Sequence, residues 1–127
     1  MALELEDLEV YKEANKIADE IWNIVLAWDY FQKDTIGKQI VKSSDSISAN
    51  ISEGYGRYFH KENLQFCYYS RGSLFETKTW LLKSFNRKII SEEKYQDLKG
   101  QLITLQKKLN GYIKFLRNNK PDNNQII

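Results

Sequence analysis

The feature that most constrains the fold is a heptad seam near the C-terminal end of the chain. Large apolar residues recur there at alternating intervals of three and four, at Tyr95, Leu98, Leu102, Leu105, Leu109, Tyr112 and Leu116. This spacing aligns the side chains along one face of an α-helix, where they pack against other helices. Ser91 followed by Glu92 and Glu93 is a typical helix start, because a hydroxyl caps the first turn and acids favour the positive end of the helix dipole. The seam therefore predicts a long helix that packs against others.

Three earlier segments also carry apolar residues at helical spacing. Between them, residues 29–34 and 54–60 break the spacing and are predicted loops. Pro121 is the only proline, so no residue before it prevents long helices. Four helices joined by short loops predict an all-α protein, an antiparallel up-down-up-down four-helix bundle. The predicted helices span about residues 8–28, 35–54, 61–88 and 91–117.

The second predicted helix is unusual because many of its side chains are small. Small side chains let a neighbouring backbone approach closely, and serines propagate a helix poorly, so tertiary packing must hold this segment. Asp7 is the predicted cap of the first helix, and Asp34 or Thr35 of the second. The small residues are Ser43, Ser44, Ser46, Ser48, Ala49, Ser52 and Gly54.

Length and composition limit the domain organisation and the cofactors. The 127 residues fit one domain, which we expect over residues 1–117, followed by a flexible tail over residues 118–127. Cys67 is the only cysteine and His60 the only histidine, so no disulfide, zinc site or di-iron centre is expected. The acidic N-terminus lacks an apolar signal core, and no apolar run approaches the ~20 residues that span a bilayer. We therefore expect a cytoplasmic protein with no cofactor and no membrane contact.

The sequence contains no recognisable catalytic site. Cys67 falls on the apolar stripe of the third predicted helix, which favours a buried structural thiol over a nucleophile. The break at Gly54-Tyr55-Gly56 follows a helix rather than a strand, and it lacks the Gly-Lys-Ser/Thr of a phosphate-binding loop. We therefore predict that the protein is not an enzyme.

The most informative polar set is Asn50, Glu53, Arg71 and Glu76. The first two lie on the second predicted helix and the other two on the third, its antiparallel neighbour. Two carboxylates beside one arginine are compatible with acid–base chemistry, but no loop or cofactor motif that would bind an electrophile accompanies them. We favour a buried polar network that sets the register of the two helices.

Charge is distributed unevenly along the chain. Residues 1–34 hold nine acids and three bases, whereas residues 35–127 hold eight acids and sixteen bases. Such charge usually decorates solvated helix faces, but it also suits a basic face for nucleic acid, or an acidic face that meets the basic face of the next subunit. Bases interleaved with aromatic residues favour looped or single-stranded RNA. The candidate nucleic-acid contacts are Lys42, Arg57, Lys61, Lys107, Lys108, Lys114 and Arg117.

Aromatic residues are more numerous than one small bundle interior readily accommodates. The chain has three Trp, eight Tyr and six Phe. Exposed aromatic surface usually marks an interface, although some of these rings are expected to cover the bundle ends. We predict homo-oligomerisation, with Trp22 and Trp80 as candidate contact residues. The rings expected to be partly exposed are Trp22, Trp28, Tyr30, Phe31, Tyr55, Tyr58, Phe59, Tyr69 and Trp80.

Several linked motifs resemble those of one protein family. The most specific reads Ser-Ile-Ser-Ala-Asn-Ile-Ser-Glu-Gly-Tyr-Gly-Arg over residues 46–57. Residues 5–12, 72–76, 91–95 and 109–111 carry further parts of the pattern. Over about residues 5–117 the chain resembles the 23S rRNA intervening-sequence proteins, which are related to the accessory proteins of diversity-generating retroelements.

The resemblance implies a four-helix bundle that assembles into a ring-shaped homopentamer. Some members of the family are encoded inside insertions in bacterial large-subunit rRNA genes, and basic surfaces of the retroelement relatives bind nucleic acid. The leading hypothesis is thus a non-catalytic oligomer that binds rRNA, another structured nucleic acid or a nucleoprotein through a basic face. The alternative is a structural or protein-interaction ring without affinity for nucleic acid.

Overall fold

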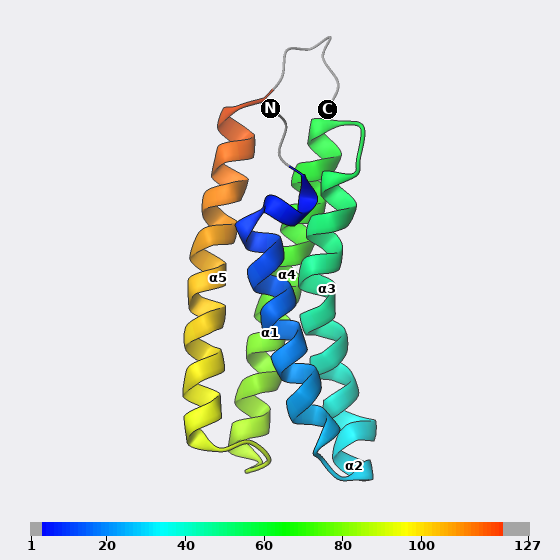
Figure 1. Ribbon diagram of the computed structural model, residues 1–127, viewed down its shortest axis with the longest axis vertical. Helices are drawn as coiled ribbons and strands as arrows, with labels where there is room; N and C mark the ends of the chain where they lie inside the picture. Colours follow the sequence, from blue (N-terminus) through cyan, green and yellow to red (C-terminus); the bar gives the residue numbers. More distant parts are fainter. Residues whose placement is uncertain (1–3, 121–127) are drawn as a thin grey trace.

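The computed structural model describes residues 4–120, and their regular structure is entirely helical (Figure 1). Four long helices run through the molecule, and shorter helical turns precede the first and second of them. The elements are the 3-10 turn η1 (Leu5–Asp7), α1 (Glu9–Leu26), the short α2 (Tyr30–Gln32), the wide π-type turn η2 (Lys33–Gly37), α3 (Lys38–Tyr55), α4 (His60–Asn86) and α5 (Glu92–Asn118).

The long helices α1, α3, α4 and α5 form an antiparallel four-helix bundle (Figure 1). α1 packs against α3 and α5, and α4 packs against the same two helices, so α3 and α5 occupy opposite corners. Consecutive long helices are antiparallel neighbours because each connection is short. This arrangement confirms the predicted fold class.

The heptad seam of α5 forms one wall of the hydrophobic core. Leu98, Leu102, Leu105 and Leu109 are completely or almost completely buried. At the end of the helix, Ile113 is buried while Tyr112 is only partly covered. An α-helix has 3.6 residues per turn, so a seam with a period of 3.5 drifts slowly around the helix. Tyr112 therefore moves to the edge of the core, although Leu116, the last member of the seam, is still buried.

The helices α3 and α4 approach each other through small polar side chains. Ser70 Oγ of α4 donates a hydrogen bond of 2.7 Å to the Ile47 carbonyl oxygen of α3, and Thr77 Oγ1 donates one of 2.9 Å to Ser43 Oγ. Gly54 lies against Asn63 so closely that there is no room for a Cβ atom. Short side chains permit this approach, as the composition of the second predicted helix indicates. The buried residues of α4 are Asn63, Cys67, Ser70, Leu74, Thr77, Leu81 and Ser84.

Two predicted helix starts differ from the structure. The predicted loop over residues 29–34 is wrong, because Asp29 already caps a helical turn and exchanges hydrogen bonds with Gln32. These two side chains form a capping box, which satisfies two backbone N–H groups that the turn leaves free. Asp7 does not cap α1, since it lies inside η1 and its carboxylate accepts a hydrogen bond from the Glu4 backbone N–H.

The last connection follows the prediction more closely. α4 ends before Lys88, whose φ of 62° ends the helical path, and Ser91 caps α5 by accepting a hydrogen bond from the Lys94 backbone N–H. α5 ends at Asn118. Most of the predicted flexible tail, residues 121–127, lies outside the described residues.

Candidate nucleic-acid interface

The predicted polar network between α3 and α4 is not formed within the chain. The Asn50 side chain donates to the Ser46 carbonyl oxygen, and Glu53 is exposed and forms an ion pair with Arg57. Arg71 and Glu76, the α4 members of the set, have separate partners. Glu53 and Glu76 lie on the outward faces of their helices. Their carboxylates are therefore exposed to solvent and do not meet between α3 and α4.

The α4 members of that set contact different helices and residues. Arg71 Nη1 donates a hydrogen bond of 3.1 Å to Asn110 Oδ1 of α5. Glu76 is exposed and accepts a hydrogen bond of 3.1 Å from the Trp80 indole N–H, one turn along the same helix. Arg71 therefore belongs to the α4–α5 side of the bundle, away from α3.

A basic surface extends along the outer side of α5. Lys107, Lys114 and Arg117 are exposed and follow one another at intervals of seven and three residues, which places them on the same helix face. Arg71 and Lys78 approach this face from α4, since Lys78 Nζ donates to Gln106 Oε1 at 3.0 Å and Arg71 bonds Asn110. We call these five residues the α5 basic face.

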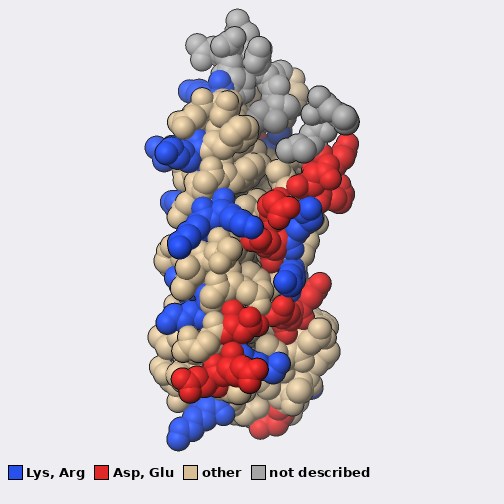
Figure 2. All heavy atoms as spheres, turned by 60° about the vertical axis from the view of Figure 1, so that its left-hand side comes forward, with Lys and Arg blue, Asp and Glu red and all other residues tan. Residues whose placement is uncertain are grey.

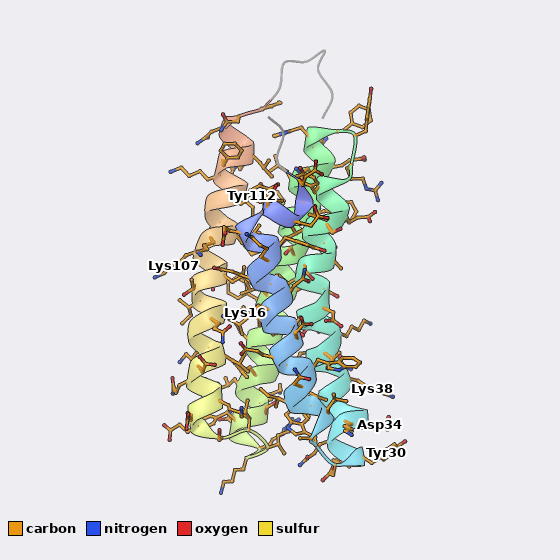
Figure 3. The ribbon with its side chains drawn as sticks, viewed as in Figure 1. Lys16, Tyr30, Asp34, Lys38, Lys107 and Tyr112 are labelled. Atoms are coloured by element: carbon orange, nitrogen blue, oxygen red, sulfur yellow. The ribbon has the colours of Figure 1, made fainter. Side chains whose placement is uncertain are left out.

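The α5 basic face has few nearby acids to neutralise it. No Asp or Glu occurs between residues 98 and 120. Within residues 4–120, none of the five bases forms an ion pair. Figure 2 shows the α5 side of the bundle turned forward. Lys and Arg gather at its upper left, whereas Asp and Glu lie mainly along the right edge and in the lower part, where Lys and Arg are interspersed with them. In Figure 3, Lys107 extends from α5 away from the other helices.

The remaining candidate bases do not join this face. Lys108 points toward α1 and pairs with Glu13, whose carboxylate raises the pKa of the lysine. Arg57 pairs with Glu53 at 2.6 Å. Lys42 is exposed on α3, the helix at the opposite corner from α5, and Lys61 lies in the first turn of α4. The structure thus brings together three of the seven predicted contacts and adds Arg71 and Lys78.

Aromatic rings lie beside two residues of the α5 basic face, Arg71 and Lys78. Arg71 stacks over Tyr68 with 5.2 Å between the guanidinium carbon and the ring centroid, and Lys78 Nζ lies 5.0 Å from the Phe75 centroid. Phe75 is about half exposed. A cation over the face of an aromatic ring is attracted by the ring's quadrupole, which favours a defined position for these two positive charges.

The two tryptophans predicted as oligomer contacts are differently placed. Trp22 is 51% exposed on the outer side of α1. Trp80 is partly buried against the core, and its indole N–H bonds Glu76. Trp28 and Tyr55, also expected to be partly exposed, likewise pack against the core. The rings that are at least half exposed are Trp22, Tyr30, Phe31, Tyr58, Phe59, Tyr69 and Phe115.

Cys67 is a sealed thiol inside the bundle. It is completely buried, its Sγ lies 3.7 Å from Asn63 Oδ1, and burial raises its pKa to about 12. We expect an aromatic disulfide reagent at neutral pH to leave native protein unmodified, because only an exposed thiolate reacts rapidly. Adding guanidinium chloride should release one equivalent of the coloured thiol. A Thr79→Cys variant, with an exposed second thiol, is the positive control, and rapid native-state reaction of Cys67 would contradict the prediction.

Metal-binding and membrane-spanning features are absent from the described part of the chain. Within residues 4–120, no three His, Cys, Asp or Glu side chains are placed to hold a metal ion. In the same range, no helix combines the length and apolar character needed to cross a membrane. The fold and this exposed basic surface define the class of protein as a small helical bundle with a basic face.

The comparisons with known proteins place this bundle in a family. The family model described as 23S rRNA-intervening sequence protein matches residues 6–111, so the chain belongs to that family. A crystal structure from Bacteroides thetaiotaomicron is similar, with a TM-score of 0.77 and 25% identity over 83% of this chain and 95% of the other. That protein is described as one of unknown function from the S23 ribosomal protein family. No curated protein matches the chain.

Proposed function

We propose that this protein is a non-catalytic, self-associating bundle of the cytoplasm that binds structured RNA through the α5 basic face. The family name suggests ribosomal RNA as the nucleic acid, and the resemblance to ring-forming proteins suggests a homopentamer. No cofactor is required for this role, because binding depends on surface charge and shape.

The observation that carries the RNA proposal is the lack of charge compensation on α5. Four other bases of the chain, Lys12, Lys38, Arg57 and Lys108, each pair with an acid. The α5 basic face keeps its five positive charges free within residues 4–120. Uncompensated bases held on a rigid helix neutralise phosphates and release the counterions that surround a nucleic acid. The half-exposed Phe75 and the exposed Phe115 offer surfaces on which unpaired nucleobases of the RNA can stack.

A protein-interaction ring without affinity for nucleic acid is the second candidate. It is favoured by the exposed apolar side chains on α1 and α2, at Trp22, Leu26, Tyr30 and Phe31. Exposed apolar surface of this kind typically marks a contact with protein. The two candidate functions differ in whether the α5 basic face binds a nucleic acid.

Binding to 23S rRNA hairpins, measured by fluorescence anisotropy at several salt concentrations, tests the RNA proposal. We expect affinity to fall steeply with salt, and a Lys107→Gln/Lys114→Gln/Arg117→Gln variant to bind at least about tenfold more weakly. Its salt slope should decrease by roughly two to three, since each lost phosphate contact removes about 0.7–0.9.

The matched control is a Lys12→Gln/Lys38→Gln/Lys108→Gln variant. It removes the same formal charge from three lysines that acids already compensate, so its affinity should stay near that of the wild type. An equal loss of RNA affinity in both variants would show that affinity depends only on the net charge of the protein, and not on the α5 basic face. No binding by the wild type at low salt would instead support the protein-interaction ring.

A further inference from the structure

One end of the bundle carries a hollow with an apolar floor. It has a volume of about 720 Å³ and lies between the end of α1, the turn that joins α4 to α5 and the first turns of α5. Ile24, Trp28 and Leu98 contribute to its floor, and Glu20 and Asp97 lie among the residues that line it. The Gln101 side-chain amide donates to both carboxylates, at 3.0 and 3.1 Å, and so holds them as a fixed acidic edge.

The same end of the bundle carries a pair of projecting rings. Tyr30 and Phe31 of α2 are 80% and 74% exposed. The two rings stand on a hydrogen-bonded helical turn. The Asp29–Gln32 capping box closes this turn, and Thr35 Oγ1 donates a hydrogen bond of 2.7 Å to the Phe31 carbonyl oxygen. We call Tyr30 and Phe31 the aromatic knob. Holding two large rings in water is unfavourable unless something covers them.

The knob and the hollow lie at the same level on different flanks. In Figure 1, α2 is at the lower right of the bundle and the turn between α4 and α5 is at the lower left. Figure 3 shows Tyr30 at the outer edge of that lower right corner. A projection on one flank and a hollow on another fit a head-to-tail contact between identical subunits, and contacts of this type close into a ring when the rotation permits.

The chemistry of the two surfaces is also complementary. Lys94 also lines the hollow, but the edge formed by the Glu20 and Asp97 carboxylates accepts hydrogen bonds, and the Tyr30 hydroxyl can donate one. Beside the knob, Asp34 is paired with Lys38, whereas Lys33 has no ion-pair partner within residues 4–120. Each ring would bury roughly 150–250 Å², and the half-exposed Trp22 and Leu26 on the same α1–α2 flank would enlarge the apolar contact.

We propose that the aromatic knob of one copy occupies the hollow of the next copy, so that the self-association contact is heterologous. This inference rests on the self-association part of the proposed function and is independent of RNA binding. It assigns both halves of the contact: Tyr30 and Phe31 on one side, and the apolar floor around Trp28 on the other.

Sedimentation velocity on three variants tests the contact, with circular dichroism to confirm that each is folded. Tyr30→Ser/Phe31→Ser removes the knob. Ala27→Arg places a long side chain at an exposed residue that lines the hollow, where the acidic edge attracts it over the floor. Tyr58→Ser/Phe59→Ser is the matched control, since it removes two rings that are 57% and 56% exposed at the other end of the bundle.

We expect the wild type and the control to sediment as the same oligomer, and the knob and hollow variants each to sediment as monomers. An equimolar mixture of these two should form a dimer, because the Ala27→Arg copy keeps a knob and the Tyr30→Ser/Phe31→Ser copy keeps a hollow. A mixture that stays monomeric, or a knob variant that keeps the wild-type sedimentation coefficient, would overturn the heterologous contact. A monomeric wild type would overturn self-association itself, and loss of RNA binding by an intact oligomer would overturn only the RNA proposal.

Discussion

Replacing Gly54 with alanine is expected to lower the free energy of unfolding by about 1–3 kcal/mol, the usual cost of overfilling a packed site. A Cβ atom at this position would lie 2.8 Å from Asn63 Oδ1, 2.9 Å from Phe66 Cβ and 3.0 Å from the Asn63 carbonyl oxygen. Asn63 is buried, so neither its side chain nor its backbone can move away easily. α3 and α4 must therefore separate locally, and the hydrogen bonds between them at Ser70 and Thr77 weaken.

The sign of this effect distinguishes close packing from helix propensity. Alanine is a better helix former than glycine by about 1 kcal/mol, so an open site should gain stability from the same change. A Cβ atom at Gly72, in the middle of α4, would have no neighbour within 4 Å, so Gly72→Ala should raise the unfolding free energy by up to about 1 kcal/mol. Urea unfolding at one fixed protein concentration measures both variants. Stabilisation by Gly54→Ala would contradict the close packing of α3 on α4.

The overall fold was predictable from apolar spacing, but the orientation of α4 was not. Apolar spacing alone would bury Phe75 and Leu82 together with Leu74 and Leu81, yet Phe75 and Leu82 are nearly half exposed. The helix instead buries hydroxyl-bearing residues such as Ser70, Thr77 and Ser84, which a count of apolar residues scores as polar. Close contact between two helices selects for small size, and each hydroxyl hydrogen-bonds a nearby oxygen of its own helix or of α3.

The candidate site was predictable only in part, for a related reason. The spacing of Lys107, Lys114 and Arg117 already places them on one helix face, and the structure confirms that placement. The pairing of Lys108 with Glu13 joins residues 95 apart, and only the packing of α1 on α5 reveals it. Apolar spacing does not indicate that Asp29 caps a helical turn, because the aromatic residues after it interrupt the helical pattern.

Replacing Leu105 with alanine is expected to cost about 2–5 kcal/mol of unfolding free energy, which tests the seam from which the fold was predicted. Leu105 lies at the centre of the seam and is fully buried among core residues of the bundle. Truncation removes one methine and two methyl carbons from the core and leaves a cavity that close-packed helices cannot fully collapse. The midpoint of urea unfolding, followed by circular dichroism, should fall strongly while the native helical signal is retained.

The matched control is Ile103→Ala, two residues earlier on the same helix. Ile103 is 36% exposed and lies off the seam, so its truncation should cost clearly less than that of Leu105. Helix propensity is too small to account for this difference: isoleucine is the poorer helix former, so the Ile103 change gains more from alanine, but by less than about 0.7 kcal/mol. Equal destabilisation by the two variants would mean that the heptad seam does not carry the core, and that the bundle depends on the α4–α5 flank to a similar extent.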